Sequence, residues 1–258
     1  MPEDLSYEER DHVALLTLRR PEARNALTFR TYAELEEAVR SCTARCLVIT
    51  GEDPAFCSGD DVKQVMAASR DRATDGQQVG SGGLTPAADA LLHTNIPVIA
   101  AVNGAAVGWG MELALFADLR VASERAKFGE LFVVRGLCSD VGGLGRLAQL
   151  IGRERAAELL FTGRVIDAHE AHEMRLVSRV VPHDELLPTA RSLAEAIAAN
   201  PPLAVQALKD GLRRALDPDW RDLGTWVTST LGRLFTTHDH REGAAAFLEK
   251  REPHFEGR

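Results

Sequence analysis

The sequence predicts an α/β fold with much parallel strand pairing, followed by a helical C-terminal region. Short apolar runs alternate with helical patterns up to about residue 185, which is typical of strands connected by helices. From Leu186 onward no strand pattern remains, and Asn200-Pro201-Pro202 interrupts an otherwise helical stretch. The 258 residues are 45% hydrophobic, enough to bury a sizeable core. We therefore expect a core over residues 1–195 and a helical region over residues 196–258, packed on the core or on another subunit.

Hydrophobic periodicity places the elements along the chain. Apolar runs predict strands at residues 12–18, 46–51, 96–102, 119–122 and 176–181. Residues 31–41 predict an amphipathic helix, because Tyr32, Leu35 and Val39 fall on one face. Further helical patterns lie near residues 86–94, 110–117, 141–151, 153–161 and 167–173. Residues 69–83 are polar and glycine-rich, so we expect a mobile surface loop there, and no Gly-Lys-Ser/Thr follows to indicate a phosphate loop.

Charge, hydropathy and cysteine content argue against several classes of protein. The net charge of -8 and the pI of about 5.5 argue against nucleic acid as the main partner. No apolar run is long enough to span a bilayer, and the first residues lack a signal-peptide core, so we expect neither a membrane partner nor secretion. The four cysteines form no CxxC pair, which favours a reducing, cytoplasmic setting without zinc or disulfide bonds.

A glycine-rich junction at residues 103–113 is the strongest functional signal. It joins the apolar run at 96–102 to the helical pattern that begins near Gly110. Glycines allow backbone N–H groups to approach a ligand closely, and a helix N-terminus leaves such groups unpaired with a partial positive charge. This combination suits a carbonyl oxygen that becomes an oxyanion. Glu112 would then be an acid or base placed beside it.

A second junction, at residues 56–62, follows the same logic. Gly59 precedes a helical run that begins at Val62, so the two junctions could each supply one N–H to a shared oxygen. The alternative is that Asp60 or Asp61 serves only as a helix N-cap.

These motifs together resemble the crotonase family, the enoyl-CoA hydratase/isomerase superfamily. The resemblance rests on FCSGDDV at 56–62, AVNG at 101–104, GWGMEL at 108–113, LRRPEARNAL at 18–27, LFTG at 160–163 and REGAAAFLEKR at 241–251. It covers residues 8 to 256, nearly the whole chain. It implies a spiral of ββα units with a helical C-terminal trimerisation region, and an assembly that is a homotrimer or a homohexamer.

The resemblance also implies a substrate and a set of binding residues. The substrate is an acyl-CoA thioester whose carbonyl lies between the backbone N–H groups of Asp60 and Trp109 and passes through an enolate. No metal and no cofactor is implied, because coenzyme A is part of the substrate. Contacts with the substrate or its CoA are implied for Ala23, Arg24, Ser58, Lys63, Phe132, Phe247 and Lys250, the last two on the CoA of a neighbouring subunit. The basic residues suit CoA phosphates, and the alternative for each is a solvated surface side chain.

The catalytic carboxylates depart from the family pattern. Hydratases of this family carry two glutamates, of which one matches Glu112, while the other falls on Phe132, which cannot activate water. We expect Glu130 to be exposed or ion-paired rather than to replace the missing glutamate. Asp140 is similar to an aspartate of the isomerase branches and is either a proton carrier or the cap of the helix near Val141. Packed near Phe132 and Trp109, its carboxyl would have a raised pKa.

Several reactions therefore stay open at this point. Hydration of a 2-enoyl-CoA and double-bond isomerisation are equally supported, the first by Glu112 and the second by Glu112 with Asp140. Thioester hydrolysis, decarboxylation or C–C bond chemistry would use the same oxyanion site with other side chains. A non-catalytic relative, such as an RNA-binding protein, is disfavoured by the acidic composition. His238-Asp239-His240 resembles a metal-ligand cluster, but the matching family segment is a structural turn.

Overall fold

Two sheets, one large and one small, form the core of the protein. The computed structural model describes residues 4–66, 84–216, 219–254, 256 and 258, so the predicted loop at 69–83 lies outside the described residues. The larger sheet has the order β1-β2-β3-β5-β7-β10, with strands Leu5–Arg10, Val13–Leu18, Cys46–Gly51, Val98–Val102, Leu119–Ser123 and Arg179–Val181. Only β1 runs antiparallel to its neighbour, and the other pairings are parallel. The predicted α/β core with parallel pairing is confirmed.

The smaller sheet was not predicted from the sequence. Its order is β4-β6-β8-β9, with strands Ala55–Cys57, Ala105–Val107, Lys127–Gly129 and Ile166–Asp167. Strands of two or three residues are too short to show an alternating pattern. The expected strand at 176–181 is likewise shorter, Arg179–Val181. The small sheet matters because β4 and β6 are parallel neighbours, so their carboxyl ends meet at one edge.

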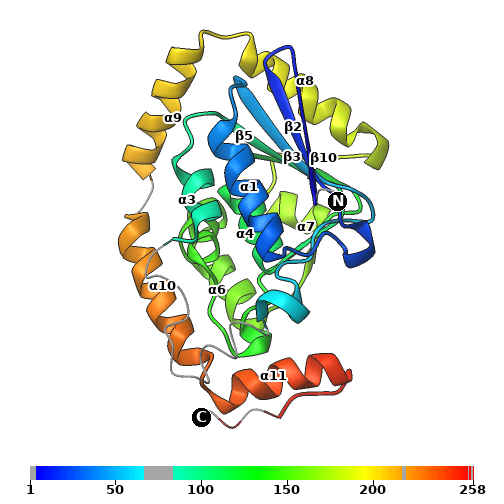
Figure 1. Cartoon of the computed structure of the whole chain (residues 1–258), viewed down its shortest axis with the longest axis vertical. Helices are drawn as coiled ribbons and strands as arrows, with labels where there is room; N and C mark the ends of the chain where they lie inside the picture. The colour runs from blue at the N-terminus through cyan, green and yellow to red at the C-terminus, as the bar shows by residue number, and fades with distance from the viewer. Residues whose placement is uncertain (1–3, 67–83, 217–218, 255, 257) are drawn as a thin grey trace.

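Helices cover both faces of the larger sheet, and the alternation of the strands decides which side chain faces which layer. α1 (Phe29–Ser41), α3 (Pro86–His93) and α4 (Trp109–Phe116) share one apolar cluster with Leu47 and Ile49 of β3. α8 (Leu186–Ala198) packs on the opposite face, against Val48 and Ile99. Figure 1 shows the sheet between these two layers. All eight residues of α4 are buried, which is why its carboxylate, Glu112, lies inside the protein.

Shorter helices connect the remaining strands. They are α5 (Leu147–Ile151), α6 (Arg153–Thr162) and α7 (Ala168–Glu173), with π-helical turns at Val62–Met66 and Gly142–Arg146 and a 3-10 turn, η3, at Val133–Arg135. The expected helix at 141–151 thus starts as a π-helical turn before α5. Two glycines in this turn, Gly142 and Gly143, leave room for a neighbouring side chain.

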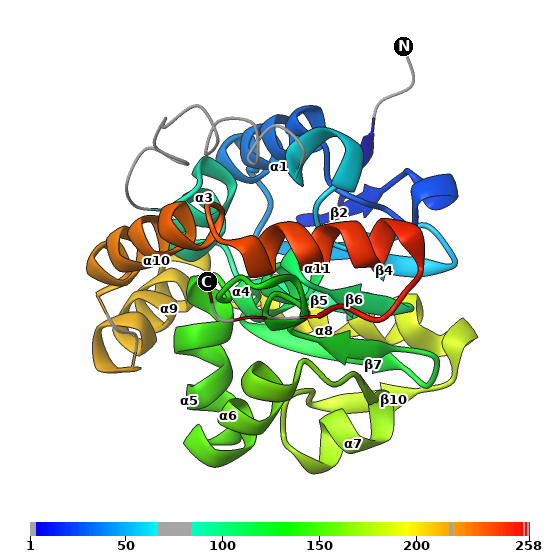
Figure 2. The ribbon, with the colours of Figure 1, turned by 90° about the horizontal axis from the view of Figure 1, so that it is seen from below.

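The C-terminal region is helical, as predicted, and wraps around the core. α9 (Pro202–Leu216) and α10 (Trp220–Leu234) run along one side, and α11 (His238–Glu249) crosses in front of the core in Figure 2. Lys209 fastens α9 to the core, because its Nζ donates to the carbonyl of Ile96 at 2.8 Å and to Asp118 Oδ2 at 2.7 Å. No helix within the described ranges is long and apolar enough to cross a membrane.

Three polar side chains in a hydrogen-bonded row connect the segment before β4 to β7 and to the turn before α8. Ser123 Oγ lies 3.0 Å from His183 Nδ1, and His183 Nε2 lies 2.9 Å from Asp53 Oδ2. Asn103 adds a hydrogen bond from its side-chain amide to Asp53 Oδ1 at 2.9 Å. Ser123 is completely buried at the end of β7, whereas the Asp53 side chain is largely exposed.

Candidate active site

The two glycine junctions meet at the carboxyl edge of the small sheet. β4 ends at Cys57 and β6 ends at Val107. After each strand the backbone turns at a glycine with positive φ, 87° at Gly59 and 55° at Gly108. A Cβ atom on Gly59 would lie 2.9 Å from the carbonyl oxygen of Val107 and 3.2 Å from the nitrogen of Trp109. The two backbones therefore approach as closely as they do only because Gly59 has no side chain.

Two backbone donors are free at this junction. Within the described part of the chain, the N–H groups of Asp60 and Trp109 donate to no backbone or side-chain acceptor. Trp109 is the first residue of α4, where an N–H has no partner inside the helix. Both residues line a cavity of about 620 Å³. Such a pair of donors can hold one carbonyl oxygen and stabilise negative charge that develops on it.

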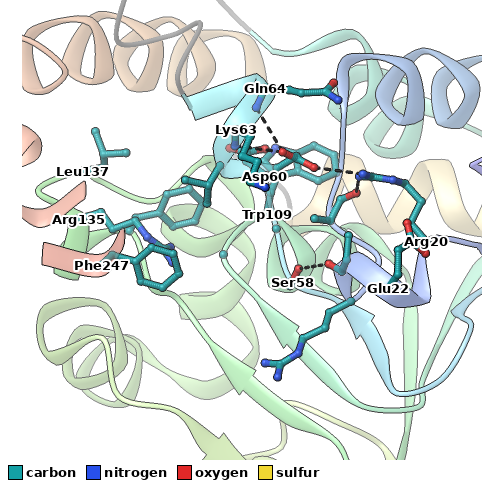
Figure 3. Close-up of a pocket in the computed structure, with 18 residues that line it drawn as sticks. Arg20, Glu22, Ser58, Asp60, Lys63, Gln64, Trp109, Arg135, Leu137 and Phe247 are labelled. Carbon is teal, nitrogen blue, oxygen red and sulfur yellow. Dashed lines mark hydrogen bonds and ion pairs between the residues drawn. The ribbon is translucent and has the colours of Figure 1, made fainter. Parts of the chain in front are cut away.

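Most of the predicted contact residues line this cavity. Ala23, Arg24, Ser58, Lys63, Phe132 and Phe247 do so, and Figure 3 shows Ser58, Lys63 and Phe247 around Asp60 and Trp109. Lys250, which follows α11 and has an exposed side chain, does not line it. Its predicted contact with the CoA of a neighbouring subunit stays a prediction. Arg20, Glu22, Gln64, Arg135 and Leu137 also line the cavity but were not selected from the sequence.

Asp140 lies beside Trp109. The indole Nε1 donates to Asp140 Oδ2 at 3.3 Å, while Asp140 Oδ1 accepts from the backbone N–H of Val141 at 2.8 Å. The side chain therefore accepts from the first N–H after it and from the indole at the cavity wall at the same time, and the expected helix cap is not formed. Burial raises the pKa of Asp140, and its two hydrogen bonds oppose the rise. Asp140 does not itself line the cavity, but it is partly exposed.

Two neighbouring aspartates at the first junction have different roles. Asp61 caps the turn at Val62–Met66 by accepting from the N–H groups of Lys63 and Gln64, at 3.1 and 3.2 Å. The Asp60 side chain instead accepts a hydrogen bond from the Tyr32 hydroxyl at 2.5 Å. Burial raises the pKa of Asp60 to about 6, against the effect of the Tyr32 bond. The Tyr32 ring also meets the Trp109 ring edge-on, with centroids 4.7 Å apart.

The structure contradicts the expectation for Glu130, which is neither exposed nor ion-paired. Glu130 is 1% exposed and Glu112 is 0% exposed, and the two carboxyl groups lie together at Gly143. A Cβ on Gly143 would lie 3.0 Å from Glu112 Oε1 and 3.0 Å from the Glu130 carboxyl carbon. The reason is β8, which ends at Gly129 and directs the next residue inward. A strand of three residues left no sequence signal for this.

The hydrogen bonds of the two glutamates are unequal. Both carboxylate oxygens of Glu112 accept from the Gly143 N–H at 3.1 Å. Glu130 Oε2 accepts from the Ser139 hydroxyl at 2.8 Å, while its Oε1 is buried without a partner. Burial, with repulsion from the carboxyl groups of Glu130 and Asp140, raises the pKa of Glu112 well above its usual range, and burial raises that of Glu130 to about 8. The pair therefore holds at least one proton near neutral pH.

Other chemistries find little support at this site. Among the described residues no group of three or more His, Cys, Asp or Glu side chains could hold a metal ion. Burial raises the pKa of Cys57 to about 12 and that of Cys138 to about 11, so neither thiol is an activated nucleophile. The groups beside the two free N–H groups that suit proton transfer near neutral pH are the carboxyl groups of Asp60, Glu112, Glu130 and Asp140.

The fold and the site together define an α/β enzyme that can hold a carbonyl between two backbone N–H groups beside buried carboxyl groups. The family model described as enoyl-CoA hydratase/isomerase matches residues 8–258. The chain therefore belongs to the enoyl-CoA hydratase/isomerase family of enzymes, and the resemblance found in the sequence is confirmed.

Proteins of this family with different reaction names are similar to the chain. The crotonyl-CoA hydratase of Syntrophomonas wolfei is 36% identical over 98% of both chains. A crystal structure of an enoyl-CoA hydratase/isomerase from Pseudoalteromonas atlantica T6c is 28% identical with a TM-score of 0.87, covering 98% of this chain and 100% of that one. A monofunctional enoyl-CoA isomerase from M. smegmatis is 33% identical with a TM-score of 0.70, covering 84% of this chain and 96% of that one. Likeness alone thus does not choose between hydration and isomerisation.

Proposed function

We propose that the enzyme moves a double bond within an enoyl-CoA, converting a 3-enoyl-CoA to a 2-enoyl-CoA, with Asp140 as the proton carrier. The observation that carries this proposal is the difference in access between the carboxyl groups. Asp140 is partly exposed beside Trp109, whereas Glu112 is 0% exposed, and Phe132 lines the cavity at the position of the second hydratase glutamate. One accessible carboxylate suffices for a proton shift along the acyl chain, whereas hydration needs a held water as well.

The oxyanion site would make the proton shift possible. The thioester carbonyl oxygen accepts from the N–H groups of Asp60 and Trp109, each worth about 3 kcal/mol of transition-state stabilisation. Ionised Asp140 takes a proton from C2, and the enolate electrons move the double bond. Protonated Asp140, which is partly exposed and exchanges its proton with solvent, then protonates C4. Burial favours this role, because a raised pKa brings the carboxyl closer to a proton carrier that works near neutral pH.

Glu112 has a supporting role in this proposal. Both of its oxygens accept from the N–H of Gly143, three residues after Asp140, so it holds the turn that carries the proton carrier. Hydration of a 2-enoyl-CoA is the second candidate. It is favoured by the neighbouring Glu112 and Glu130 carboxyl groups, which could share a water if the site opens.

Deuterium exchange and product mass separate the two reactions. With 3-hexenoyl-CoA in D₂O, we expect 2-hexenoyl-CoA carrying deuterium at C4 and no gain of water. Asp140→Asn should lower this turnover by about 100-fold or more, while CoA-thioester binding measured by calorimetry persists. Asp184→Asn, an exposed aspartate outside the site, is the matched control. Turnover by Asp140→Asn at the rate of the parent protein, or 3-hydroxyacyl-CoA as the main product, would refute the isomerase proposal.

The assembly and location proposed for the enzyme rest on separate features. We propose a homotrimer or homohexamer formed through the C-terminal region from residue 196, because Leu203, Leu208, Leu212 and Leu216 of α9 are exposed together with Trp226 of α10. We propose a cytoplasmic location because all four cysteines are free thiols, three of them buried. Light scattering after size-exclusion chromatography tests the first proposal. A monomer at micromolar concentration would refute it.

A further inference from the structure

Arg135 is a cation of the cavity that the proposed reaction does not use. It lies at the end of η3 and lines the same cavity as the two free N–H groups. Within the described part of the chain it forms no ion pair, and its Nε is buried without a hydrogen-bond partner. Burial lowers the pKa of Arg135, with Asp60 as the charged group that opposes the change. A partly desolvated guanidinium without an ion-pair partner is costly, so such a group is suited to an anion that arrives with a ligand.

Contacts with α11 hold Arg135 in place. Its carbonyl accepts a hydrogen bond from His240 Nδ1 of α11, at 2.7 Å, when that nitrogen carries the proton. Gly136 follows in the left-handed conformation, and a Cβ there would lie 2.9 Å from the His240 backbone. The guanidinium carbon lies 4.6 Å from the centroid of the Phe247 ring, also on α11. The cation is therefore positioned by packing and needs no rearrangement to receive a ligand.

The surroundings of Arg135 are apolar on the cavity side. Phe132, Leu137 and Phe247 line the cavity near it, so the charge acts in a medium of low dielectric. Figure 3 shows Arg135, Leu137 and Phe247 on one side of Asp60 and Trp109, and Arg20, Glu22 and Ser58 on the other. A ligand whose carbonyl reaches the free N–H groups thus has basic side chains at both ends of the cavity. The Arg20 guanidinium is already paired with Asp61, whereas Arg135 is not.

We propose that Arg135 binds a carboxylate carried on the acyl chain, so that the substrate class is a carboxyacyl-CoA rather than a simple fatty acyl-CoA. This inference deepens the proposed function and rests on its placing the thioester at Asp60 and Trp109. A carboxylate fits the planar fork of a guanidinium with two parallel hydrogen bonds. The other source of the same chemistry is a phosphate of CoA. The acyl chain is favoured because the cavity wall around Arg135 is apolar and lies away from the Ser58 side.

Binding of unreactive, saturated thioesters tests the proposal without relying on turnover. The probes are succinyl-, glutaryl- and adipyl-CoA, with pentanoyl-CoA as the uncharged reference, each measured by calorimetry on the full chain. We expect at least one carboxylated thioester to bind about 10- to 100-fold more tightly than pentanoyl-CoA. Arg135→Met should abolish that preference and Arg135→Lys should keep only part of it. Arg155→Met, an exposed arginine of α6 outside the cavity, should keep it in full.

Three outcomes overturn the proposal. One is that none of the three carboxylated thioesters binds more tightly than pentanoyl-CoA. Another is that Arg135→Met keeps the preference while its circular dichroism shows a folded protein. The third assigns Arg135 to a CoA phosphate: Arg135→Met weakens every CoA thioester equally but leaves the matching pantetheine thioesters unchanged. Failure of the proposed function is distinguishable, because it appears as no turnover of any enoyl-CoA while the preference for a carboxylated thioester stands.

Discussion

Replacing Glu130 with glutamine should stabilise the protein, and increasingly so as the pH rises. The Glu130 carboxyl is buried beside Glu112, and its pKa rises from the ordinary value of 4.5 to about 8. In the unfolded chain the group loses its proton near pH 4.5, whereas in the folded protein it keeps the proton until about pH 8. Folding is therefore penalised over this window, because the unfolded state gains from ionising and the folded state cannot.

The magnitude follows from the same two values. Each pKa unit corresponds to about 1.4 kcal/mol, so the penalty is about 1 kcal/mol at pH 5, about 2 kcal/mol at pH 6 and about 4 kcal/mol at pH 8. Below pH 4.5 both states are protonated and the penalty vanishes. Glutamine has the same shape, keeps an oxygen for the Ser139 hydroxyl and offers an N–H₂ group toward Glu112. Glu130→Gln removes the penalty with little change in packing.

Urea unfolding at fixed protein concentration, at pH 5, 6, 7 and 8, measures the effect. The free energy of unfolding of Glu130→Gln minus that of the parent protein should grow across the series. Glu154→Gln, at an exposed position of α6, is the matched control and should show no such growth. Parallel pH profiles for Glu130→Gln and the parent protein would refute the reasoning, because they would mean that Glu130 ionises normally in the folded state.

Three further variants test the hydrogen bond from Trp109 to Asp140 and the close approach of the two junctions. Trp109→Phe removes the Nε1 donor that lowers the pKa of Asp140, so that pKa should rise. The acidic limb of the pH profile of kcat/KM should therefore move to higher pH. An acidic limb at the same pH as in the parent protein would contradict the role of this hydrogen bond. Gly110→Ala would bring a Cβ to 2.0 Å from the carbonyl oxygen of Cys57 and should cost on the order of 3 kcal/mol in unfolding free energy. Gly211→Ala, at a helical position with open space around it, should instead raise the unfolding free energy by up to about 1 kcal/mol. Equal changes in unfolding free energy at the two glycines would contradict the packing argument.

The sequence was most informative where a local rule determines the structure. A glycine between a buried strand and a helix predicts a turn with free N–H groups, and the structure has such turns at Gly59 and Gly108. The absence of the second hydratase glutamate at Phe132 could also be recognised, because the resemblance to the family assigns that glutamate to a fixed distance from Glu112. The helical character of the C-terminal region was predictable because no strand pattern remains after Leu186.

Features that depend on contacts between distant segments were not predictable in the same way. The inward direction of Glu130 is set by β8, whose pairing with β6 and β9 leaves no periodic pattern in three residues. The separation of roles between Asp60 and Asp61 depends on Tyr32, which lies on another element. Arg135 is brought into the site by α11, more than one hundred residues later in the chain. In each case the deciding partner is remote in sequence.

The hydrogen-bonded row of Ser123, His183 and Asp53 shows that the order of the hydrogen bonds alone does not assign a function. A serine, an imidazole and a carboxylate in hydrogen-bonded order are the elements of a hydrolase triad. Here Ser123 has no exposed surface, and its hydroxyl also accepts from the Arg125 N–H at 3.1 Å, so no ester or peptide can reach it. The exposed member is Asp53, at the wrong end for nucleophilic attack. The same three side chains instead connect β7 to the turn before α8 and to the segment before β4. Access to the nucleophile, and not the order of the hydrogen bonds alone, makes such an arrangement a protease or esterase site.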